Sequence, residues 1–67
     1  MLNPDSAIPL YIQLKDHLLN QIQTGVYAAG SRLPSERELA DTFRLSRMTA
    51  RMALQLLIQD GIAQPRK

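Results

Sequence analysis

The sequence contains no cysteine and no tryptophan, and it has a single histidine, His17. Without cysteine the chain forms neither a disulfide nor a thiolate metal site, and one histidine is too few for a histidine-rich metal site. No apolar run of about 18 residues occurs, so we expect no membrane-spanning segment. The N-terminus MLNPDS also lacks the basic and apolar regions of a signal peptide. These absences predict a cytoplasmic protein without cofactor or metal.

The length of the chain limits what it can build. Its 67 residues, 45% apolar and 21% charged, have the composition of one small globular domain. A chain of this size buries only about 60% of the surface that its unfolded form exposes, which leaves little material for a water-excluding active site. We therefore expect a binding domain and no enzyme. We expect residues 1–8 to form a flexible lead and residues 9–67 to form the domain.

Positive charge gathers in the second half of the chain. Residues 32–67 contain seven basic residues against four acidic ones, and residues 42–59 contain three arginines and no acid. A charge asymmetry of this kind favours a polyanion as partner, with an ordinary solvated surface as the alternative.

Apolar periodicity and capping residues predict three helices, at about residues 9–24, 35–43 and 46–60. Pro9 suits the first position of a helix, because its missing N–H needs no partner there. Gly25 and Gly61 are expected to end the first and third helices.

The second and third predicted helices both begin at a serine. Ser35 and Glu38 form a capping-box pattern, in which each side chain binds the backbone N–H of the other residue. Ser46 is expected to cap the third helix. About three residues separate the two helices, which is typical of a helix-turn-helix motif.

The third helix has two distinct faces. Ala50, Ala53 and Leu57 lie together on a helical wheel, whereas Arg47 and Arg51 lie one turn apart on another side. The small inward residues allow close packing on the second helix. Arginine forks near the N-terminus of such a helix can reach guanine O6 and N7 in the major groove of DNA. An unspecified helical bundle is the alternative.

Two motifs at a fixed distance make the pattern more specific. The stretch Leu-Pro-Ser-Glu-Arg-Glu-Leu-Ala occupies residues 33–40, and Ser-Arg-x-Thr-x-Arg follows at residues 46–51. The predicted domain begins with Pro-Leu-Tyr-x-Gln at residues 9–13. Further matching positions are Ile22, Gly25, Gly30, Phe43, Ala53, Leu54, Leu57, Asp60 and Gly61. From Pro9 to Lys67 the sequence resembles the N-terminal winged helix-turn-helix domain of GntR-superfamily bacterial transcription regulators, and its opening resembles the HutC, YtrA or MocR-like branches.

The resemblance implies a mostly helical fold with a small β component, and a recognition helix at residues 46–60 in the major groove of double-stranded DNA. It implies a repressor that acts as a homodimer on a two-fold operator. A small-molecule effector would bind only through a domain absent from this chain. The predicted DNA contacts are Ser35, Arg37, Arg44, Ser46, Arg47, Thr49 and Arg51.

The sequence departs from the family pattern at several positions. Arg44 stands where the family usually has glycine, and a positive φ there would cost arginine roughly 1 kcal/mol, so either the turn is adjusted or a phosphate contact offsets the cost. Ala50 replaces the usual valine, and Pro65 stands where arginine is common. The chain ends at Lys67, before the Gly-x-Gly-Thr wing tip of the family, so we expect a truncated wing in which residues 62–64 start a strand.

Other interpretations remain open at this point. Arg37 can form a surface ion pair with Asp41 instead of contacting DNA. Leu56 and Ile58 are unusually apolar for their positions, which favours either cover for the wing or a protein–protein contact. A helical interaction module that uses these two residues is therefore the alternative function. A pyridoxal phosphate-containing MocR-like regulator would share the same N-terminal domain.

Overall fold

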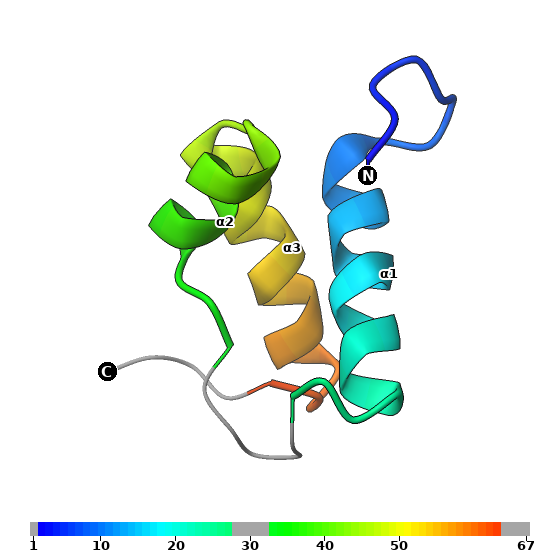
Figure 1. The fold of residues 1–67 in the computed structure, drawn as a ribbon, viewed down its shortest axis with the longest axis vertical. Coiled ribbons are helices and arrows are strands. Elements are labelled where there is room, and N and C mark those ends of the chain that lie inside the picture. The colour runs from blue at the N-terminus through cyan, green and yellow to red at the C-terminus, as the bar shows by residue number, and fades with distance from the viewer. Residues whose placement is uncertain (1, 28–32, 64–67) are drawn as a thin grey trace.

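A computed structural model describes residues 2–27 and 33–63 of the chain. Within them the helices are α1 (Leu10–Gln23), α2 (Glu36–Phe43) and α3 (Arg47–Gln59). α3 packs against both α1 and α2, and the latter two helices lie on different sides of it (Figure 1). α3 is therefore the central helix, and the side chains through which it contacts the other two helices are expected to be small and apolar.

Among the described residues, the buried core consists of leucine and alanine. Each helix contributes at least two of its fully or nearly buried residues, which are Leu14, Leu18, Leu39, Ala40, Ala50, Ala53 and Leu57. Complete burial of a leucine side chain contributes about 1.5–3 kcal/mol. The inward face predicted for α3 is confirmed, because Ala50, Ala53 and Leu57 are all fully buried.

The first and third helices end in the same way. Gly25 has φ 84° and Gly61 has φ 74°, and both follow the last helical turn. Val26 N–H donates to the Gln21 carbonyl at 2.8 Å, and Ile62 N–H donates to the Leu57 carbonyl at 2.9 Å. These are the long hydrogen bonds of the Schellman motif, which satisfy carbonyls that the helix leaves unpaired. The two glycines therefore end their helices as predicted.

The segment before α1 folds back onto that helix. The Gln13 side chain accepts a hydrogen bond from Asn3 N–H at 2.7 Å. Its amide nitrogen donates to the carbonyls of Asn3 at 2.9 Å and Ile8 at 2.7 Å. Leu2 packs at the edge of the core. Leu2, Asn3 and Ile8, which belong to the segment predicted as a lead, thus contact the domain.

The small β component is not present in residues 2–27 and 33–63. Ile62 and Ala63, expected at the start of a strand, instead complete the cap of α3. Both donate their backbone N–H to the Leu57 carbonyl, at 2.9 and 3.1 Å, and both pack against the core. An N–H used in this cap is not available for a strand ladder. The rest of the expected wing, residues 64–67, lies outside the described residues.

Candidate nucleic-acid interface

The start of α2 is held by a reciprocal cap. Ser35 Oγ accepts the backbone N–H of Glu38 at 3.1 Å, and the Glu38 carboxylate accepts the backbone N–H of Ser35 at 3.0 Å. The predicted capping box is therefore confirmed. It fixes the direction of the first turn of α2, which carries Glu36 and Arg37 on the outside of the motif.

The turn between α2 and α3 is tight and left-handed. Arg44 has φ 56° and ψ 49°, and its N–H donates to the Ala40 carbonyl. Leu45 N–H donates to the same carbonyl at 2.9 Å, while the Leu45 side chain packs against the core. The exposed Arg44 side chain is thereby placed at the corner of the motif. The positive φ expected from the family pattern is present, with arginine in the place of glycine.

α3 begins with two hydroxyl side chains that bind each other. Ser46 Oγ accepts the Thr49 backbone N–H at 3.1 Å, which confirms the predicted cap. Ser46 Oγ also lies 2.8 Å from Thr49 Oγ1, where either hydroxyl can donate. A pair of hydroxyls has two hydrogens and uses one of them between its members. The other hydrogen remains able to donate to an anion without loss of the cap.

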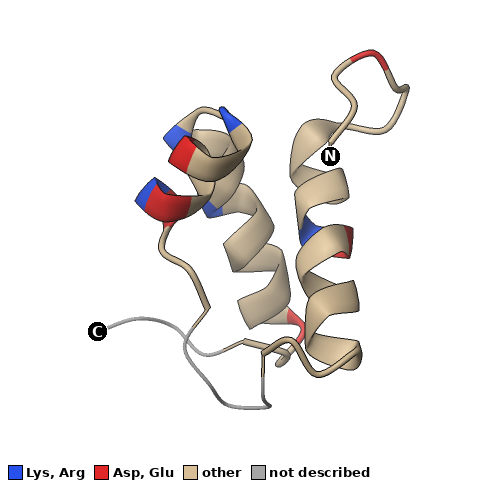
Figure 2. Ribbon diagram, viewed as in Figure 1, with Lys and Arg blue, Asp and Glu red and all other residues tan. Residues whose placement is uncertain are grey.

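The outward side of α3 carries the arginines. The Arg47 side chain is 68% exposed and that of Arg51 is 49% exposed, while Met48 between them is also exposed. Positive residues gather at α2, at the turn and at the start of α3, with negative residues among them on α2 (Figure 2). The motif therefore presents a mixed face on which the arginines extend into solvent and the acids lie beside them.

One acid on α2 contacts both arginines of α3. Arg51 Nε donates to Glu36 Oε2 at 2.9 Å, and its Nη2 donates to Oε1 at 3.4 Å. Arg47 Nη2 lies 3.5 Å from the same Oε1. The Arg51 hydrogen bond lowers the pKa of the Glu36 carboxyl, desolvation opposes the shift, and the two positive charges add to it. Glu36 in turn raises the pKa of Arg51, chiefly through the same hydrogen bond.

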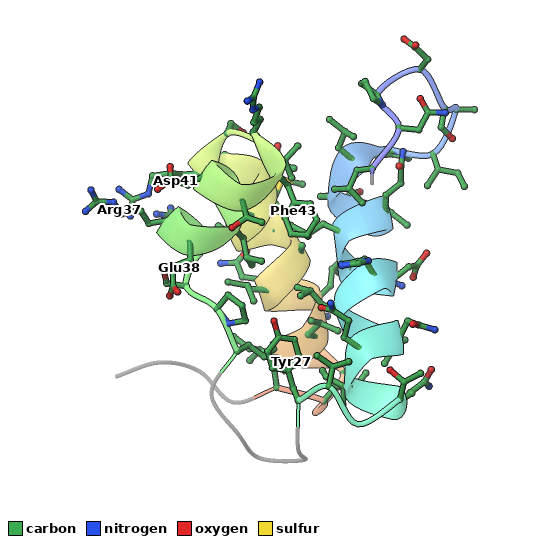
Figure 3. All side chains as sticks on the ribbon, viewed as in Figure 1. Tyr27, Arg37, Glu38, Asp41 and Phe43 are labelled. Carbon is green, nitrogen blue, oxygen red and sulfur yellow. The ribbon has the colours of Figure 1, made fainter. Side chains whose placement is uncertain are left out.

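Arg37 has a different environment. It is exposed, and its side chain extends away from α2 into solvent (Figure 3). Among the described residues, neither Arg37 nor Asp41 has an oppositely charged group within 4.0 Å. The ion pair considered for these two residues is therefore not formed, and the Arg37 guanidinium remains available to an external partner.

The structure brings six of the seven predicted residues to the N-terminal ends of α2 and α3, and it places Arg44 at the turn that joins them. Sequence reasoning missed Glu36, which it counted only among the four acids of residues 32–67. Glu36 and Arg51 are 15 residues apart. No periodicity connects residues on two different helices, so only the packing angle of α2 on α3 reveals this contact.

Leu56 and Ile58 are half-buried in the structure and do not belong to its exposed large hydrophobic residues. They do not form the exposed apolar patch that an interaction module would need. The alternative function based on these two side chains is therefore not favoured.

Comparison with known proteins agrees with this geometry. Residues 10–67 match the family described as bacterial regulatory proteins, gntR family. The chain belongs to this family. Its three helices are the family's helix-turn-helix domain, and the resemblance inferred from the motifs at residues 33–40 and 46–51 is confirmed.

Two named repressors are among the relatives of this chain. Over 61 residues the chain is 44% identical to the HTH-type transcriptional repressor NagR of Bacillus subtilis, covering 91% of this chain and 25% of NagR. It is 43% identical over 54 residues to the histidine utilization repressor of Pseudomonas aeruginosa, covering 81% of this chain and 22% of the repressor. The chain therefore spans about a quarter of the length of each of these two repressors.

A solved structure shares the fold. YtrA from Sulfolobus acidocaldarius, a GntR-family transcription factor, superposes with a TM-score of 0.85 and 31% sequence identity. The match covers 91% of this chain and 53% of YtrA. The relatives of this chain are transcription regulators, not enzymes. No helix in the described part of the chain is long and apolar enough to cross a bilayer.

Proposed function

We propose that this gntR-family domain binds double-stranded DNA with α3 in the major groove. The observation that carries the proposal is the pair of exposed arginines in the first turns of α3, on a different side of this helix from the buried Ala50, Ala53 and Leu57. Arg47 and Arg51 reach base edges, where an arginine fork discriminates guanine. α3 has small alanine side chains toward the core and long arginine side chains toward solvent, and a helix that enters the major groove needs such exposed side chains.

The remaining predicted residues contact the DNA backbone in this proposal. Arg37, in the first turn of α2, and Arg44, at the turn before α3, are exposed cations. Ser35, and the Ser46–Thr49 hydroxyl pair, lie at helix N-termini, whose N–H groups and dipole favour phosphate. Contacts of this kind supply affinity and register, whereas the base contacts supply sequence preference.

The whole protein is proposed to repress transcription from the bacterial cytoplasm, where its DNA target lies. Two copies of the domain would read a two-fold operator, because helix-turn-helix dimers place their recognition helices about one DNA turn apart. A small-molecule effector would bind a domain outside this chain and change the relative placement of the two copies. The named repressors among the relatives support this sign of regulation.

The test is fluorescence anisotropy of the chain on a random-sequence duplex pool over a salt series. Arg47→Ala and Arg51→Ala should each weaken binding, because each removes a positive charge from the face that α3 presents to DNA. Lys15→Ala is the matched control, because it removes the same charge from α1, where Lys15 pairs with Asp16 at 2.8 Å. Equal losses in all three variants would refute the assignment of α3 as the recognition helix.

A further inference from the structure

The contact between Glu36 and Arg51 is side-on. The carboxylate accepts one hydrogen bond from Nε at 2.9 Å and one from Nη2 at 3.4 Å, so it occupies one edge of the guanidinium. A guanidinium has five N–H donors arranged around a rigid plane. The hydrogens of Nη1 and the second hydrogen of Nη2 point along the other edges and are not used by Glu36.

That unused end of the guanidinium has the shape that guanine requires. Guanine presents two acceptors, O6 and N7, to the major groove, and one arginine fork binds both. Because Glu36 holds the Nε edge, the Arg51 side chain loses much of its rotational freedom before DNA arrives. We propose that Glu36 is a positioning residue that aims the terminal fork of Arg51 at one guanine of the target site. This inference rests on the DNA-binding function proposed above.

The surroundings of Glu36 fit this role. It is the first residue of α2, directly after the N-cap residue Ser35, and only 27% of its side chain is exposed. Arg51 lowers the pKa of the Glu36 carboxyl, so the side chain is ionised at neutral pH. Arg47 reaches the same carboxylate only through Nη2 at 3.5 Å. Its fork is therefore less constrained than that of Arg51, and the two arginines differ in how strongly they depend on Glu36.

A carboxylate at this surface also has an electrostatic effect of the opposite sign. Its negative charge opposes the phosphate backbone and weakens binding to every sequence. Removal of the charge should therefore tighten non-specific binding, while removal of the positioning contact should reduce discrimination of guanine. An acid without a positioning role changes only the first quantity. Asp41 is such an acid, since it is exposed on the same helix and has no cation within 4.0 Å among the described residues.

The experiment uses the 67-residue chain and a duplex selected by it from a random-sequence pool. Each G·C pair of the selected duplex is replaced in turn by A·T, and dissociation constants are measured by anisotropy for wild type, Arg51→Lys, Glu36→Gln and Asp41→Asn. Arg51→Lys keeps the charge and removes the fork, so it identifies the guanine that Arg51 contacts. Far-UV circular dichroism and thermal unfolding establish that each variant is folded.

At that guanine we expect wild type and Asp41→Asn to discriminate by about 5- to 150-fold, the range of one bidentate contact. Glu36→Gln should lose most of this discrimination while it binds the random pool more tightly than wild type does. The Glu36→Gln/Arg51→Lys double variant should discriminate no worse than Arg51→Lys alone, because the two residues act through one contact.

A second variant keeps the charge. Glu36→Asp is shorter by one methylene, so it should leave random-pool binding at the wild-type level and still lower discrimination. Full discrimination by folded Glu36→Gln or Glu36→Asp would overturn the positioning role and leave the DNA-binding proposal intact. If wild type selects no sequence from the pool, the proposed function fails, and the role of Glu36 fails with it.

Discussion

Replacement of Arg44 by glycine is expected to stabilise the domain. All three helices end next to a residue with a left-handed backbone, and two of these residues are glycine, Gly25 and Gly61. A Cβ built on either glycine would meet no atom within 4 Å, so space is not what favours glycine there. The backbone conformation itself is the reason, and in residues 2–27 and 33–63 Arg44 is the one position at which an L-side chain must tolerate it.

The size of the effect follows from two opposing contributions. At φ 56° and ψ 49° Arg44 lies at the centre of the left-handed region, where the clash of Cβ with the carbonyl oxygen costs about 1–2 kcal/mol. Glycine removes this cost, but it adds about 0.5–1 kcal/mol of backbone entropy to the unfolded chain. The net gain is about 0.5–1 kcal/mol, which corresponds to a rise of about 2–8 °C in Tm for a domain of this size.

The assay is thermal unfolding followed by circular dichroism at neutral pH. Arg44→Ala is the matched control, because it removes the same exposed guanidinium and keeps the left-handed Cβ. We expect Arg44→Ala to change the free energy of unfolding by less than about 0.5 kcal/mol, as is usual for a surface substitution. Equal Tm values for Arg44→Gly and Arg44→Ala, or a lower Tm for Arg44→Gly, would refute the reasoning from backbone strain.

Three other predictions follow from the described contacts. Leu57→Ala should lower the free energy of unfolding by about 2–5 kcal/mol, because Leu57 is fully buried at the centre of the core, and urea unfolding measures this loss. A loss below about 1 kcal/mol would contradict the core assignment. Ser35→Ala removes the acceptor of the Glu38 N–H and should lower Tm by about 4–8 °C, the equivalent of about 1 kcal/mol, whereas an unchanged Tm would show that the cap is not formed in solution. In an NMR pH titration the Glu36 carboxyl should titrate below the ordinary glutamate range, and Arg51→Ala should raise its midpoint toward that range, with Arg47 still acting on it. Since the folded pKa is the lowered one, the ion pair stabilises the fold above the unfolded pKa, and this contribution disappears as the pH falls through the folded value. Identical midpoints in both proteins would contradict the contact.

The sequence was sufficient for features that depend on near neighbours in the chain. Ser35 and Ser46 cap helices through residues three positions away, and Gly61 ends α3 through the carbonyls just before it. The spacing of Ala50, Ala53 and Leu57 by three and four residues likewise identified the buried face of α3. These features depend on residues at most two helical turns apart, so the sequence predicts them without knowledge of how the helices pack.

Family membership was also evident from the sequence, because it depends on the spacing of two motifs. The predicted β component is not seen at residues 62 and 63. Their N–H groups bond to the Leu57 carbonyl, and whether an N–H completes a helix cap or joins a strand depends on which acceptor lies nearby in space.

Only the tertiary structure revealed which charges meet. Glu36 and Arg51 lie on different helices, and Arg37 and Asp41 lie one turn apart on the same helix, yet the first pair is formed and the second is not. Local spacing favours the second pair, but exposed side chains gain little from an ion pair and remain solvated. The first pair forms because α2 packs against α3 through buried leucine and alanine side chains. This packing brings the Glu36 carboxylate within 2.9 Å of the Arg51 guanidinium.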